Sequence, residues 1–147
     1  MDIATCLALI DLLCAREFPA DHGGSDVGTA GPGYVTVELM TSRGAAAEHP
    51  EIRQRTAADF HAYREALAGR LADRWGRQPP WGQLTLRTRM SRGEAIPQPW
   101  ADLCLRTDEL DLWQPDHTGR WLALGVADRD EADEIHLLAT VTEIPPP

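Results

Sequence analysis

The longest periodic pattern of apolar residues lies between Pro50 and Gly76. Large apolar side chains recur there every three or four positions, at Ile52, Phe60, Tyr63, Leu67, Leu71 and Trp75. This spacing places them on one side of an α-helix. Pro50 suits the first helical turn, and Gly76 suits the position just past the last one. The opposite side is charged, so we expect the helix to cover an apolar surface formed by strands.

A second helical pattern occupies residues 2–17, where apolar residues follow the same spacing on a wider face. Asp2 is a suitable N-cap, and Pro19 closes the segment. The stretch that follows, residues 20–33, contains five glycines and a proline. It lacks the Gly-Lys-Ser/Thr of a phosphate-binding loop. We therefore predict a mobile surface loop outside the core, with a ligand-covering lid as the alternative.

Patterns of period two predict the strands. They cover Tyr34–Met40, Gln83–Met90, Trp100–Thr107, Leu110–Gln114, Arg120–Ala127 and Ile135–Ile144. Trp100–Gln114 can also be one kinked strand, and the last two strands are expected to form an antiparallel hairpin around residues 128–134. The prediction is an α+β fold: a mostly antiparallel sheet of five or six strands with two helices packed on one face. Residues 1–144 would form one domain, followed by a proline tail at 145–147.

Within that fold, one side of the long helix is expected to pack against the sheet. Phe60, Leu67 and Leu71 would lie buried on it. Their predicted partners on the strands include Leu84, Leu86, Leu124 and Leu137.

Charge narrows the range of partners. The 147-residue chain has a formal net charge of −9, distributed as −5 over residues 1–50, +4 over 51–100 and −8 over 101–147. Nucleic acid and anionic membranes attract proteins with a concentrated basic face, so neither is an expected partner. The N-terminal segment has neither the basic region nor the small-residue cleavage site of a signal peptide. The apolar run of the first predicted helix is too short to span a bilayer.

The cysteines favour a reducing compartment. The chain has three, an odd number, and Cys6 and Cys14 are roughly 12 Å apart on one predicted helix, too far for a disulfide. All three have mainly apolar neighbours, which is typical of buried, reduced thiols. We therefore predict a cytoplasmic protein.

Catalytic and metal-binding motifs give weak signals. His61 and Glu65 have the i, i+4 spacing of helical metal ligands, but no second histidine follows at the required interval, and the surrounding face is charged and solvated. The acidic segment 128–134 lacks the glycine and register of a calcium loop, so it is interpreted as a charged turn. Asp116-His117 is adjacent in sequence only, and no nucleophile motif is present. We predict no catalytic residue, no metal site and no cofactor.

Arginine and tryptophan supply the remaining candidates. Arg87, Arg89 and Arg92 share a predicted basic strand face, which either binds an anion or pairs with nearby aspartates. Ligand-binding candidates are Arg87, Arg89, His61 and His117. The chain has five tryptophans, and a homodimer hypothesis pairs the basic strand with an acidic one about a twofold axis. Its interface candidates are Trp100, Trp113, Arg92 and Asp111.

Two functions are compatible with these patterns. The first is a small, acidic, non-enzymatic domain that binds another protein, such as an inhibitor or immunity protein facing a basic target. The second is a small-molecule-binding protein or enzyme with a pocket between the long helix and the sheet.

Overall fold

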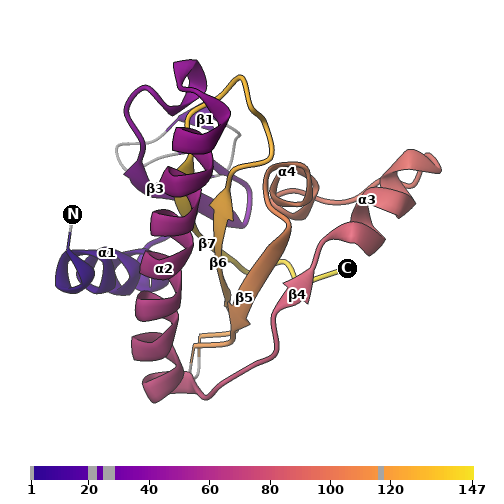
Figure 1. Ribbon diagram of the computed structural model, residues 1–147. Coiled ribbons are helices and arrows are strands. Elements are labelled where there is room, and N and C mark those ends of the chain that lie inside the picture. Colours follow the sequence, from indigo (N-terminus) through magenta and orange to yellow (C-terminus); the bar gives the residue numbers. More distant parts are fainter. Residues whose placement is uncertain (1, 20–22, 25–28, 116–117) are drawn as a thin grey trace.

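An antiparallel sheet forms the centre of the molecule (Figure 1). The computed structural model describes residues 2–19, 23–24, 29–115 and 118–147. The strand order is β1-β2-β3-β7-β6-β5-β4. The strands are β1 (Gly23–Gly24), β2 (Thr29–Gly31), β3 (Tyr34–Thr41), β4 (Trp81–Gly82), β5 (Glu109–Trp113), β6 (Trp121–Ala127) and β7 (His136–Thr142). The predicted α+β class with an antiparallel sheet is confirmed, including the β6–β7 hairpin.

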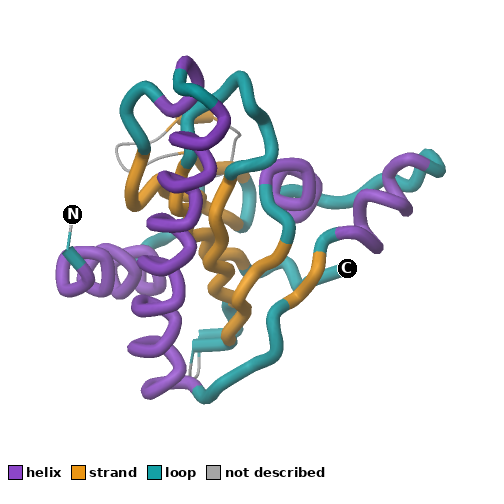
Figure 2. The backbone as a smooth tube through the Cα atoms, in the orientation of Figure 1, coloured by secondary structure: helices purple, strands orange, loops and turns teal. Residues whose placement is uncertain are grey.

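Helices flank the sheet on both sides (Figures 1 and 2). They are α1 (Ile3–Ala15), α2 (Pro50–Trp75), α3 (Leu84–Ser91) and α4 (Trp100–Arg106), with a short 3₁₀ turn, η1 (Ala45–Ala47). α1 and α2 share one core cluster with the sheet, and α3 and α4 share a second cluster on the opposite face. The two predicted helices therefore lie on one face as expected, and two further helices cover the other face.

The long helix α2 follows its sequence pattern closely. His49 caps its first turn, and it ends at Trp75 with Gly76 in the left-handed region at φ 88°. Phe60, Leu67 and Leu71 are buried in the same cluster as Leu124 and Leu137. This part of the packing prediction is correct.

Two segments predicted as strands are helices. In α3, Leu86 is buried in the second core cluster, whereas Leu84 is 70% exposed, so neither packs on α2 as predicted. In α4, Trp100, Leu103 and Cys104 are buried, a spacing of three and four residues that is helical. The prediction was wrong because alternation over a few residues also occurs by chance in short helices, where it says nothing about which side is buried.

The two central strands are buried on both faces. Leu122, Leu124 and Val126 of β6 pack toward α1 and α2, whereas Ala123 and Ala127 pack toward α3 and α4. Such strands lack the polar face that half-buried strands show. The near-continuous apolar sequence of β6 is explained by this double cover.

The glycine-rich stretch contributes to the sheet. Gly23–Gly24 and Thr29–Gly31 form strands, and Ala30 belongs to the core, so the prediction of a loop outside the core is wrong for these residues. Of the remainder of the predicted loop, residues 32–33 form the turn between β2 and β3, and residues 20–22 and 25–28 lie outside the described residues. Within the described ranges, no helix combines the length and apolar character needed to cross a membrane.

Candidate functional site

The arginines predicted to bind a ligand have structural partners instead. Arg87 Nη1 donates to the carbonyl oxygens of Cys104 and Thr107, 3.0 Å away in each case. These carbonyls lie at the end of α4, so Arg87 fastens that helix to α3. Arg89 forms an exposed pair with Glu94, with Nη2 3.0 Å from Oε1. The basic strand face expected from the sequence is therefore absent, because its residues lie on a helix.

The predicted histidines do not join these arginines. His61 Nε2 lies 2.8 Å from Asp128 Oδ2, so it connects α2 to the β6–β7 loop. His117 lies outside the described residues. The ligand set Arg87, Arg89 and His61 is thus distributed over separate contacts and does not form one site.

The predicted interface tryptophans belong to the interior. Trp100 is 1% exposed and its Nε1 donates to Ile144 O, while Trp113 is 4% exposed and donates to Gly76 O. Arg92 is exposed at the end of α3, and Asp111 pairs with Arg64 of α2. The dimer hypothesis placed Trp100 and Trp113 at the surface and Arg92 on an edge strand, whereas both tryptophans are buried and Arg92 lies at the end of a helix.

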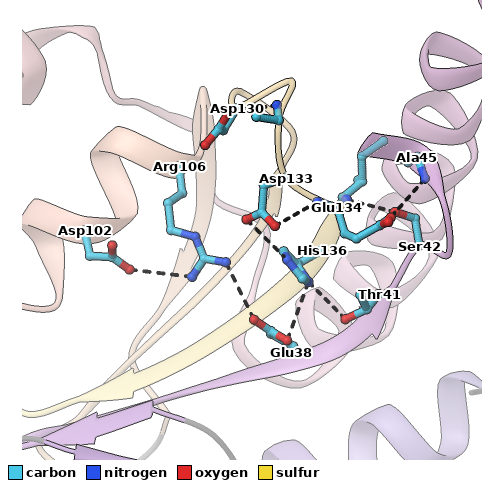
Figure 3. Close-up of polar contacts among 12 residues, drawn as sticks. Glu38, Thr41, Ser42, Ala45, Asp102, Arg106, Asp130, Asp133, Glu134 and His136 are labelled. Atoms are coloured by element: carbon cyan, nitrogen blue, oxygen red, sulfur yellow. Dashed lines mark hydrogen bonds and ion pairs between the residues drawn. The ribbon is translucent and has the colours of Figure 1, made fainter. Parts of the chain in front are cut away.

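The structure instead brings charged residues together beside α4 (Figure 3). Glu38 comes from β3, Asp102 and Arg106 from α4, and Asp130 and Asp133 from the β6–β7 loop. A hollow of about 310 Å³ opens here, lined by Leu105, Arg106, Ala127, Asp130, Asp133 and Glu134. A second hollow, of about 610 Å³, lies between α4 and β3 and shares Arg106. We call these two hollows, with Glu38 and His136 between them, the α4 groove.

Carboxylates dominate the α4 groove. Glu38, Asp102 and Asp133 have half-exposed side chains, at 50%, 55% and 55%. Arg106 reaches Glu38 Oε1 at 3.7 Å and Asp102 Oδ2 at 3.6 Å, both longer than a hydrogen bond. Exposed pairs of this kind contribute only about 0–1 kcal/mol. Both carboxylates therefore remain accessible to another cation.

His136 is buried beside the groove, between Glu38, Thr41 and Asp133 (Figure 3). Its Nδ1 is 2.9 Å from Thr41 Oγ1 and 3.5 Å from Glu38 Oε2, and its Nε2 is 3.6 Å from Asp133 Oδ2. His136 therefore connects the ends of β3 and β7 to the β6–β7 loop.

The β6–β7 loop, residues 128–134, is fixed through its backbone. Arg53 of α2 donates to Asp133 O at 2.8 Å and to Asp130 O at 2.9 Å. Because this guanidinium binds carbonyl oxygens, it holds the chain in place without pairing with the side-chain carboxylates. Asp130, Glu131 and Asp133 are exposed. The loop therefore presents its charge in a defined arrangement.

Glu134 fastens the end of the loop. Its carboxylate accepts hydrogen bonds from Ser42 Oγ at 2.5 Å and from the backbone N–H groups of Gly44 and Ala45 at 2.9 and 3.0 Å. The hydrogen bond from Ser42, followed by those from the backbone, lowers the pKa of Glu134. This carboxylate is a structural anchor that joins the loop to the residues after β3.

Only part of this site has a signal in the sequence. The acidic run 128–134 is recognisable there, as a charged turn. Glu38, Asp102, Arg106 and His136 are far apart in the chain, and no spacing rule connects them. Among the residues described, no group of three or more histidine, cysteine, aspartate or glutamate side chains is arranged to hold a metal ion.

Comparison with known proteins adds no relative. No protein-family model, curated protein or solved structure matches this chain. The site must therefore be interpreted from its own geometry.

Proposed function

We propose that this protein is a non-enzymatic binding protein whose α4 groove and β6–β7 loop receive a basic segment of another protein. One observation carries the proposal: Arg53 fixes the loop through the carbonyl oxygens of Asp130 and Asp133, while the carboxylates of the same residues stay exposed. The loop thus carries uncompensated negative charge on a fixed backbone. Inhibitors and immunity proteins belong to this class.

A fixed acidic surface favours association in two ways. Its field accelerates encounters with a basic partner, an effect that weakens as salt increases. Its ordered backbone also reduces the entropy lost on binding, because less of the loop has to become immobile. Residues 101–147, which include this loop, carry a net charge of −8.

An apolar contact lies beside the charges. Leu105 lines the groove and is 56% exposed, although a leucine is usually buried. Charged rims supply steering and specificity, while apolar anchors supply much of the affinity. Leu105 is the residue we assign to that anchoring contact.

The test compares two triple variants with equal changes in charge. The loop variant carries Asp130→Asn, Glu131→Gln and Asp133→Asn; the control carries Glu17→Gln, Asp59→Asn and Asp73→Asn, three exposed carboxylates outside the groove. Asparagine retains the acceptor oxygens with which Asp130 and Asp133 bind the N–H groups of Ala132 and Glu134. The loop backbone should therefore keep its conformation.

Proteins captured by the immobilised parent are identified by mass spectrometry. Each one is then titrated against the parent, the loop variant and the control variant. Three exposed ion pairs at roughly 0.5 kcal/mol each amount to about tenfold in affinity, so the loop variant should bind about tenfold more weakly than the control. The difference should disappear at high salt. A partner that binds both variants equally at low salt would contradict the proposal.

A further inference from the structure

Another cavity lies on the other side of the sheet from α4. An open cleft of about 790 Å³ is bounded by α2, the segment 77–80 that follows it, and β5. A pocket between the long helix and the sheet is one of the two predictions from the sequence. The arginines predicted to bind a ligand, Arg87 and Arg89, do not line this cleft. Its polar wall consists of Arg64, Glu109 and Asp111. We call it the α2–β5 cleft.

Arg64 is shared between two carboxylates. Its side chain is 9% exposed, with Nη1 3.1 Å from Asp111 Oδ2 and Nη2 3.3 Å from Glu109 Oε1. Its buried Nε has no hydrogen-bond partner among the described residues. One guanidinium therefore faces two carboxylates. Glu65 and Arg77 complete the charged lining, so the cleft has one more negative than positive group.

Asp111 is the more buried of the two carboxylates. Burial is the main reason that its pKa is raised; Arg64 lowers the pKa, and the nearby Glu109 raises it. The charged form of a carboxylate in such a place is stabilised by additional positive charge. Its neighbour Glu109 is 44% exposed and can be reached from the cleft.

The other walls of the cleft are small or apolar. Ala68, Gly69 and Ala72 form the surface of α2, and Pro79 and Pro80 form the opposite side. A Cβ atom added at Gly69 would meet no atom within 4 Å. This space accommodates a short hydrocarbon stem that ends at the carboxylates.

We propose that the α2–β5 cleft binds an alkylammonium or alkylguanidinium group, with its cationic head on Asp111 and Glu109 and its apolar stem between Ala72 and Pro80. The same chemistry is found in free amines and in the lysine or arginine side chains of a protein. The site uses none of the residues of the α4 groove, so it does not depend on the function proposed above.

The experiment is a titration of the ¹⁵N-labelled protein followed by NMR. The probes are ethylguanidinium chloride and n-butylammonium chloride, with N-ethylurea as the neutral analogue and sodium chloride at equal ionic strength as the salt control. We expect saturable shifts of the Gly69 amide and the Trp113 indole with both cations, and none with the two controls. N-acetyl-argininamide separates the two sources: tighter binding than ethylguanidinium indicates a protein side chain, and weaker binding indicates a free amine.

Three variants locate the site. Asp111→Asn should weaken ethylguanidinium binding by about tenfold or more, because a charged partner is lost. Gly69→Leu adds a large side chain to the α2 wall of the cleft and should also abolish saturable binding, which tests the site even if Asp111→Asn fails to fold. Gly69→Ala adds only a methyl group and is the size control, in which binding should weaken much less than in Gly69→Leu. The Asp130, Glu131 and Asp133 loop variant should bind the cation normally.

Two results would overturn the inference. One is a parent protein in which N-ethylurea causes the same shifts as ethylguanidinium, or in which neither cation causes saturable shifts. The other is a folded Gly69→Leu variant that binds ethylguanidinium as tightly as Gly69→Ala does. Neither result would bear on the protein binding proposed for the α4 groove, which is tested separately with the loop variant.

Discussion

Replacing Gly125 by alanine should destabilise the protein, because strand β6 has no room for a methyl group there. A Cβ atom at this position would lie 2.7 Å from Leu110 Cδ2, and 3.3 Å from both Glu109 O and Thr107 Cγ2. Leu110 is 1% exposed and packed in the second core cluster, so its side chain cannot move away freely. Glu109 O belongs to the backbone of the neighbouring strand and is equally constrained.

The expected magnitude follows from two opposing effects. Overpacking a well-filled core costs about 1–3 kcal/mol. Removing a glycine also restricts the unfolded chain, which stabilises the folded state by about 0.4–1 kcal/mol. The net expectation for Gly125→Ala is a loss of roughly 1–2 kcal/mol in the free energy of unfolding.

Gly69→Ala is the matched comparison, since it makes the same chemical change in open space. Gly69 lies in the interior of α2, and its added methyl group meets nothing within 4 Å. Alanine is the better helix former by about 1 kcal/mol, so this variant should be more stable than the parent.

Urea unfolding followed by tryptophan fluorescence measures both changes. The free energy of unfolding should fall in Gly125→Ala and rise in Gly69→Ala, so that the two variants differ from each other by roughly 2–3 kcal/mol. A Gly125→Ala protein as stable as the parent would refute the reasoning, because it would mean that Leu110 repacks at no cost.

Three further predictions concern the core and the loop. Leu67→Ala should lower the free energy of unfolding by about 2–5 kcal/mol, since Leu67 is fully buried on the core-facing side of α2. A change below about 0.5 kcal/mol would contradict this prediction. Glu134→Ala should destabilise the protein at neutral pH and progressively less in acid. Because the pKa of Glu134 is lowered in the folded protein, the stabilisation by Glu134 is present above its unfolded-state pKa and is lost as the pH falls through its folded-state pKa. Melting curves of the parent and of Glu134→Ala across pH will measure this loss. The Asp130, Glu131 and Asp133 loop variant should melt within a few degrees of the parent in calorimetry, because Arg53 holds the loop by its carbonyl oxygens; a large drop would assign those side chains a structural role.

Local sequence information accounts for α2 and for the strands of the hairpin. The apolar spacing, Pro50 and Gly76 act within a few residues of one another, so they determine the helix and its ends wherever it packs. The same holds for the alternation over Tyr34–Met40, which forms β3 almost as predicted. Here the local preference and the tertiary environment agree.

Local information was insufficient for α3 and α4. Gln83–Met90 alternates as a strand does, but Leu86 and Met90 are also four apart, and the helix uses that spacing. Only the packing against the second face of the sheet distinguishes the two patterns. Trp100 and Trp113 could not be assigned to core or surface for the same reason, because burial is a property of the assembled structure.

The sequence by itself determined the acidic charge, the run at 128–134 and the presence of a long helix over a sheet. The tertiary structure alone decided which charges meet. Glu38, Arg106 and His136 come together because β3 pairs with β7 and α4 packs beside them, and Arg64 meets Asp111 because α2 lies beside β5. Such contacts join residues that are far apart along the chain, and their geometry is set by the packing of whole elements, which no short-range pattern encodes.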